Sequence, residues 1–146
     1  MNRAKTATRV LSIFAALLLL LASLTACSGG VTREEAKTAM DSLLSALDNE
    51  NYTEAAALYH PDAAMSEDLL AAFAEQVKTK VGIDLTEGAT VEKITGISSS
   101  YYDSTVDGSR YALTAKIKAG DKTADLTVEV IRNDRGYGIF RVECNP

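Results

Sequence analysis

The sequence predicts an α+β fold in which N-terminal helices pack on a curved antiparallel meander sheet of about four strands. Between residues 33 and 81, apolar residues recur at spacings of three and four, as they do on one face of a helix. From residue 89 onward they alternate with polar residues, which is typical of half-buried strands, and glycine-containing turns separate the alternating runs. Helices that precede an antiparallel sheet must cover one of its faces, and this arrangement defines the α+β class.

The first helix is expected to begin at about Arg33, because Thr-Arg-Glu-Glu at residues 32–35 has the form of a capping box. It is expected to end in the polar cluster at residues 48–51. A shorter helix is expected in YTEAAALYH, residues 52–60, and to be ended by Pro61, because the residue before a proline is disfavoured in a helix. The apolar stripe of the first helix consists of Ala36, Ala39, Met40, Leu43, Leu44 and Leu47.

A third helix is expected after Ser66, whose hydroxyl can cap it, with acidic residues in the first turn where the helix dipole favours them. Gly82 is expected to end this helix in a left-handed conformation. The helical part of the domain is therefore one long and two shorter pieces. The buried stripe of the third helix is expected to be Leu70, Phe73, Val77 and Val81.

Four strands are expected from residue 89 to residue 144, separated by turn signals at residues 107–108, 119–122 and 133–136. In the first strand the alternation slips around residues 96–100, which predicts a bulge or bend that curves the sheet. The expected strands are residues 89–106, 109–119, 122–132 and 137–144.

The N-terminus has the pattern of a secretory signal. MNRAKTATR carries three basic residues and no acid, and it leads into the 15 uncharged residues VLSIFAALLLLLASL. A bilayer-spanning helix needs roughly 20 residues. Because 23 residues without charge separate Arg9 from Arg33, length alone leaves an uncleaved N-terminal membrane anchor open.

Leu-Thr-Ala-Cys at residues 24–27 resembles a bacterial lipobox, and the resemblance covers the N-terminal 27 residues. It implies that Cys27 is the lipid attachment site and, after cleavage behind Ala26, the mature N-terminus. The implied organisation is a signal peptide at residues 1–26, a lipidated cysteine and flexible tether at 27–31, and one α+β domain at 32–146. The implied location is the extracytoplasmic side of the cell membrane, and the implied partner is the membrane itself through the lipid on Cys27.

Charge argues against nucleic acid as a partner. Removal of residues 1–26 takes away three basic residues and no acid, leaving 12 Lys and Arg against 20 Asp and Glu, a formal net charge of −8. Such a surface repels phosphate backbones. If Cys27 is acylated, Cys144 has no partner for a disulfide, and its alternation with Phe140 and Val142 predicts a thiol facing the core.

The capped helix, the segment LLSALDNENYTEAAALYHPDA and a curved meander together resemble the nuclear transport factor two-like (cystatin-like) superfamily. The positions Tyr52, Ala55, Tyr59 and Pro61 resemble a pattern of small bacterial lipoproteins of unknown function within it. The resemblance extends over nearly all of residues 31–144 and implies a cone of helices inside a bent sheet. The superfamily contains isomerases, carriers of small apolar ligands and accessory domains, so its fold does not select a function.

The sequence favours a non-catalytic binding or accessory module for a small apolar ligand or a protein partner. The alternative is an isomerase-like enzyme with a carboxylate facing a tyrosine in the same cone. His60 is the one candidate histidine base, and its position at a helix end indicates a capping or surface role. No metal or cofactor is predicted, because no Cys/His cluster or Asp-x-Asp spacing is present.

Five residues are candidates for either the lining of a pocket or a filled core, and the pattern does not decide between these roles. The polar strand faces, with Thr114 and Thr127 among them, indicate either a solvated surface or a homodimer interface through the sheet. The five pocket or core candidates are Tyr59, Phe73, Tyr111, Leu113 and Phe140.

Overall fold

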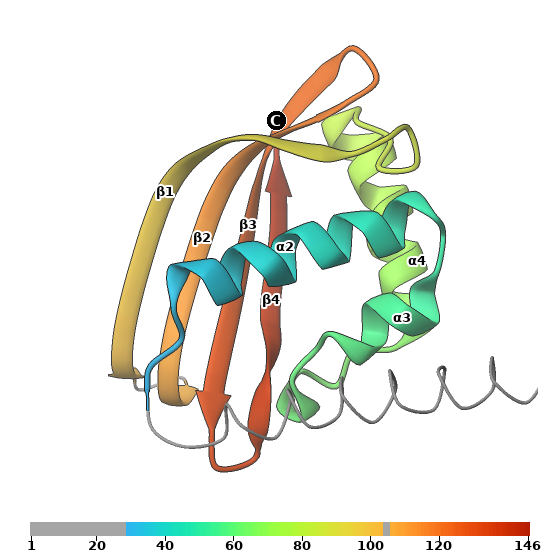
Figure 1. Ribbon diagram of the computed structural model, residues 1–146. Helices are drawn as coiled ribbons and strands as arrows, with labels where there is room; N and C mark the ends of the chain where they lie inside the picture. Colours follow the sequence, from blue (N-terminus) through green and yellow to red (C-terminus); the bar gives the residue numbers. More distant parts are fainter. Residues whose placement is uncertain (1–28, 104–105) are drawn as a thin grey trace, which may run out of the picture.

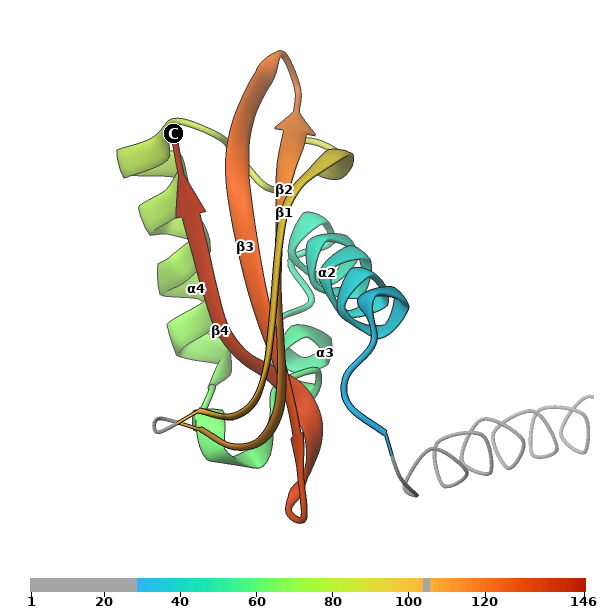
Figure 2. The same ribbon diagram turned by 90° about the vertical axis from the view of Figure 1, so that its left-hand side faces the viewer.

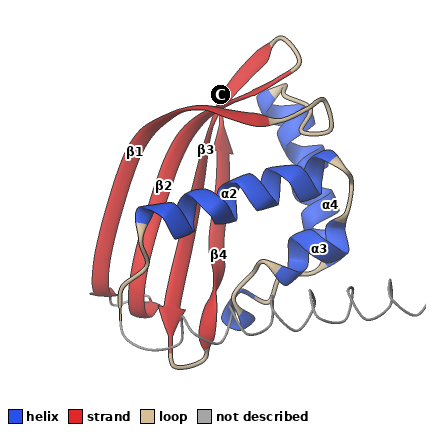
Figure 3. Cartoon of the chain, in the orientation of Figure 1, coloured by secondary structure: helices blue, strands red, loops and turns tan. Residues whose placement is uncertain are grey.

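The computed structural model describes residues 29–103 and 106–146, in which helices precede a four-stranded sheet (Figures 1 and 3). The predicted α+β class is confirmed. The predictions on residues 1–28, including the lipobox and Cys27, lie outside the described residues. The helical elements are α2 (Arg33–Asp48), α3 (Tyr52–Ala57), the 3₁₀ turn η1 (Pro61–Ala63), α4 (Glu67–Gln76) and the π-helix η2 (Val77–Val81).

The expected caps are present. The Oγ1 of Thr32 accepts the amide N–H of Glu35, while the Glu35 carboxylate accepts the amide N–H of Thr32, which completes the capping box. Ser66 caps α4 by accepting the Leu69 N–H. Gly82 ends η2 at φ +85°, a left-handed conformation that glycine adopts without strain. The short helix α3 ends at Ala57, earlier than Pro61 requires, because the next residues leave it to meet the sheet.

The sheet is an antiparallel meander in the order β1-β2-β3-β4. The predicted turn at residues 107–108 is wrong, because both residues lie inside the second strand. Gly108 has φ +111°, and a Cβ there would clash with the carbonyl oxygen of Arg132, so this glycine serves a close approach between strands. The strands are β1 (Thr90–Asp103), β2 (Val106–Ala119), β3 (Lys122–Asn133) and β4 (Gly136–Asn145).

Strand β1 curves over the helices (Figure 1), and its register against β2 shifts at three places. The shifts lie between Val91 and Lys93, between Ile94 and Gly96, and between Tyr101 and Asp103. The irregularity predicted at residues 96–100 is therefore displaced, since that run pairs regularly and the bulges flank it. Each bulge adds an unpaired residue and increases the local twist, which is how the strand bends.

The hydrophobic core lies between α2 and the sheet face that it crosses, while α4 runs alongside β4 (Figures 1 and 2). The apolar stripe of α2 is buried as predicted, as are the inward positions of β2 and β3. Among the largest fully buried side chains are Met40, Leu43, Leu47, Leu70, Leu113, Ile117, Leu126 and Ile139.

Candidate functional site

Three of the five pocket or core candidates belong to the core. Leu113 is fully buried, and Tyr59 and Tyr111 are each 8 % exposed. The hydroxyl of Tyr59 is buried and has no hydrogen-bond partner among the described residues, and burial raises its pKa. These three side chains belong to the hydrophobic core cluster, and of the five candidates only Phe73 lines one of the two grooves described below.

Phe140 does not take the core-facing position that the alternation of β4 predicts. Val130 pairs with Ile139 and Glu129 pairs with Arg141, so Phe140 is the extra residue of a bulge. The bulge gives the inward position to Ile139, which is fully buried, while Phe140 is half-buried and lies outside the core cluster. The core assignment of Phe140 is therefore corrected, because a bulge exchanges the two faces of a strand.

His60 is a buried structural residue. It caps η1, the turn that follows it, because its Nδ1 accepts the Asp62 N–H at 3.1 Å. With Nδ1 an acceptor, we assign the hydrogen to Nε2, which donates to Asn133 Oδ1 at 3.0 Å. His60 therefore has a capping role, as expected, but it caps the turn that follows it. The alternative of a surface position is wrong, since His60 is 1 % exposed. Both ring nitrogens are engaged, which leaves neither for a substrate.

Phe73 is half-buried and lines a groove of about 500 Å³ between the helical segment α4–η2 and the end of β4. The helical wall combines Phe73, Val77 and Val81 with the polar side chains of Gln76 and Lys80, and the strand wall consists of consecutive residues of β4. Its lining consists of Phe73, Gln76, Val77, Lys80, Val81, Val142, Glu143, Cys144, Asn145 and Pro146.

Cys144 is a free thiol that packs half-buried against the core beside this groove. Burial, together with the charge of Asp125, raises the pKa of Cys144 to about 11. The thiol is therefore protonated near neutral pH, and the thiolate that nucleophilic catalysis requires is scarce.

The helical wall of the groove is fixed by an ion pair. Lys78 Nζ lies 2.6 Å from Asp84 Oδ2, and Asp84 also accepts hydrogen bonds from the hydroxyl and the amide of Thr86. The hydrogen bond from Lys78 and those from Thr86 hold the pKa of Asp84 at about 2, below its ordinary value of 3.8. This contact ties η2 to the loop that leads into β1.

We predict that Asp84→Asn lowers the free energy of unfolding by about 1 kcal/mol at pH 6, since Lys78 is exposed to solvent. A carboxyl whose folded pKa is depressed stabilises the fold above its unfolded pKa, and this stabilisation disappears as pH falls through the folded pKa. We therefore expect the difference in the free energy of unfolding between wild type and Asp84→Asn, measured by urea titration, to be constant down to about pH 4 and to shrink toward pH 2. Asp134→Asn is the control, because Asp134 is an exposed carboxylate without an ion pair in the described part of the chain. A stability difference for Asp84→Asn that does not change with pH would contradict the stabilising role of the Asp84 carboxylate.

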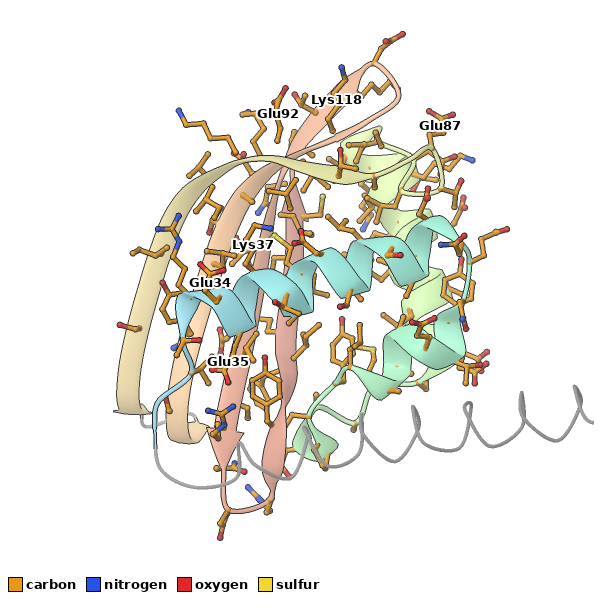
Figure 4. All side chains as sticks on the ribbon, viewed as in Figure 1. Glu34, Glu35, Lys37, Glu87, Glu92 and Lys118 are labelled. Atoms are coloured by element: carbon orange, nitrogen blue, oxygen red, sulfur yellow. The ribbon has the colours of Figure 1, made fainter. Side chains whose placement is uncertain are left out.

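A second groove, of about 610 Å³, lies between α2 and the start of β1. Charged side chains line it, including Lys37 and Glu92 (Figure 4), and Lys37 Nζ is bound to Asp41 Oδ2 at 2.6 Å. The groove is larger than the one beside β4, and its lining also includes Leu44, Val91 and Ile94, but it has no aromatic side chain. Of the two grooves, the one beside β4 offers an aromatic contact, through Phe73, and it lies beside an edge strand of the sheet.

The outward face of the sheet carries polar side chains that pair with one another across strands. Arg110 Nη2 donates to Glu129 Oε2 at 2.7 Å, and the hydroxyls of Thr114 and Thr127 are 2.9 Å apart. Thr114 and Thr127 lie directly opposite each other, whereas Arg110 and Glu129 are diagonal neighbours, and both kinds of cross-strand pair stabilise a sheet. The predicted homodimer through this face remains a prediction.

Within residues 29–103 and 106–146, no group of three or more His, Cys, Asp or Glu side chains is arranged to hold a metal ion. Helices long and apolar enough to cross a membrane are also absent from this part of the chain. No family model, curated protein or solved structure matches the chain. The function is therefore argued from the geometry.

Sequence reasoning found Phe73 but missed the groove that it lines. The 3-4-4 spacing of the stripe correctly indicates that Leu70 and Val77 are buried, while Phe73 and Val81 prove half-buried. The sequence did contain one indication of the groove's helical wall, because the apolar stripe continues to Val81, beyond the end of α4. That β4 ends beside it depends on packing between distant segments.

Proposed function

We propose that this protein is a lipid-anchored extracytoplasmic accessory module, attached to the cell membrane through Cys27, which binds a partner at the groove beside β4. The observation that supports the anchor is that packed structure lies within a few residues of Cys27 in the sequence. Val31 is buried, and its amide N–H donates to Ser109 Oγ at 2.8 Å. A buried, hydrogen-bonded residue therefore lies four positions after the cysteine of the lipobox-like sequence, with the capping box of α2 directly following.

The short tether orients the domain. The three residues between Cys27 and Val31 reach roughly 10 Å when fully extended. They lead to the end of the sheet where Ser109 and Arg132 lie, and Arg132 Nη1 donates to the Gly29 carbonyl at 3.4 Å. Glu35, below the first turn of α2 in Figure 4, accepts from Arg132 at 2.7 Å and fixes the same corner. An anchor at Cys27 therefore holds this corner at the membrane.

The groove lies at the opposite end of the sheet. Strand β4 begins at Gly136 near the tethered corner, and the groove residues begin at Val142, roughly 20 Å farther along the strand. The C-terminus marks that far end in Figure 1. A domain anchored through Cys27 would present the groove away from the bilayer, where a partner can reach it.

The geometry supports binding better than the isomerase-like alternative. Such an enzyme needs a carboxylate base opposite a tyrosine in an open apolar pocket. Tyr59 and Tyr111 are buried in the core, and His60 is engaged at both ring nitrogens. The helices packed on a curved four-stranded meander also support our proposal that the domain belongs to the nuclear transport factor two-like superfamily.

Cys27→Ala is the test of the anchor. In cells labelled with radioactive palmitate, we expect the variant to lose the label completely and to accumulate as precursor or leave the membrane fraction, because stable anchoring needs the acyl chains. Cys144→Ala is the matched control, since it removes the second cysteine of the chain, and it should be labelled like wild type. Palmitate labelling of Cys27→Ala at the wild-type level would refute the proposal.

A further inference from the structure

The outer edge of β4 carries the start of a fifth strand. Tyr59 forms a single parallel bridge to Ile139: the Ile139 N–H donates to the Leu58 carbonyl, and the His60 N–H donates to the Ile139 carbonyl, both at 2.9 Å. Pro61 then begins η1 and takes the chain away from the sheet. Beyond Ile139, no described segment makes a backbone hydrogen bond to this edge.

The groove begins at Val142, three residues beyond this bridge on the same strand. Its strand wall is formed by the consecutive residues 142–145, whose side chains alternate between the two faces of the sheet. A hollow on one face would be lined by every second residue, so this hollow runs along the edge itself. Its other wall presents Phe73, Val77 and Val81, and the π-helical turns that carry the two valines are of a kind often found at functional sites.

The edge of β4 differs from the other edge of the sheet. Strand β1 has three register shifts, and bulges make an edge a poor template for strand pairing. The pairing of β4 with β3 shifts once, beside Phe140, and is regular from Arg141 to Asn145. The regular part is the part beside the groove.

We propose that a partner protein binds here as an extended peptide strand, adding to the edge of β4 and placing alternate apolar side chains against Phe73, Val77 and Val81. Main-chain hydrogen bonds supply affinity in this mode, and pockets for alternate side chains supply specificity. The regularly paired residues 141–145 span roughly 14 Å, which accommodates about four residues of the peptide. The lining includes one positive and one negative side chain, Lys80 and Glu143, so a peptide segment without net charge fits the groove. This inference rests on the proposed binding role at the groove and names its partner class.

A phage-displayed library of random dodecapeptides, selected against the purified full chain in detergent, tests the inference. We expect selected peptides to alternate apolar and polar residues. Gln76→Trp, at an exposed position on the groove wall, should weaken their binding at least tenfold by filling the groove. Glu75→Trp, at the neighbouring exposed position of α4 that does not line the groove, should leave it unchanged.

Synthetic copies of the selected peptides then test the binding mode. N-methylation of one alternating set of amides should abolish binding, and methylation of the other set should be tolerated, because only one set of N–H groups faces β4. Three results would overturn the proposal: no peptide is selected, the selected peptides bind Gln76→Trp as tightly as wild type, or methylation of either set of amides weakens binding equally. Because the selection uses purified protein, it can fail while the Cys27 labelling experiment succeeds, which separates this inference from the membrane anchor.

Discussion

Gly138→Ala is expected to destabilise the domain by about 3 kcal/mol, the cost of inserting a methyl group where the backbone leaves no room. A Cβ at Gly138 would lie 2.5 Å from the His60 amide nitrogen and 2.7 Å from the Tyr59 carbonyl carbon. The new methyl group would push the segment around Tyr59 off the edge of β4, and both hydrogen bonds to Ile139 would be lost. Urea unfolding of the mature protein measures the effect.

Gly96→Ala is the matched control, because it also places alanine at a strand glycine. Its Cβ would lie 3.4 Å from the nearest atom, Thr114 Cβ, which is an ordinary contact that a slight shift accommodates. We expect a change of less than about 0.5 kcal/mol there. A Gly138→Ala protein as stable as the Gly96→Ala protein would show that the Tyr59 segment does not pair with β4.

Leu113→Ala is expected to cost about 3–5 kcal/mol, because Leu113 is fully buried at the centre of the sheet and its truncation leaves a cavity. Phe73→Ala removes a larger side chain but should cost less than about 2 kcal/mol, since Phe73 is half-buried at an open groove. The comparison by urea unfolding distinguishes filled core from groove wall. Equal losses for the two variants would place Phe73 in the core and contradict the groove.

Local chemistry made much of the fold predictable. Thr32 and Ser66 cap helices because their hydroxyls accept amides three residues on, and Gly82 ends a helix because it tolerates positive φ. The alternating runs located the four strands to within a few residues. Each of these signals depends only on neighbours in the sequence.

What the sequence did not predict depends on distant segments. The bulge at Phe140 is set by the register of β4 against β3. Gly108 is required because the Arg132 carbonyl on the neighbouring strand leaves no room for a Cβ there. Likewise, the burial of His60 follows from the contact of its segment with β4. Candidate site residues were found as apolar positions, but their division between core and groove requires the packing of α4 beside β4.

The central proposal, a domain anchored to the membrane through Cys27, is tested most directly by intact mass spectrometry of the protein purified from bacterial membranes. We predict a mature chain of residues 27–146 whose N-terminal peptide carries a diacylglyceryl group on the cysteine thiol. A chain that retains residues 1–26, or one in which Cys27 is unmodified, would contradict the lipid anchor.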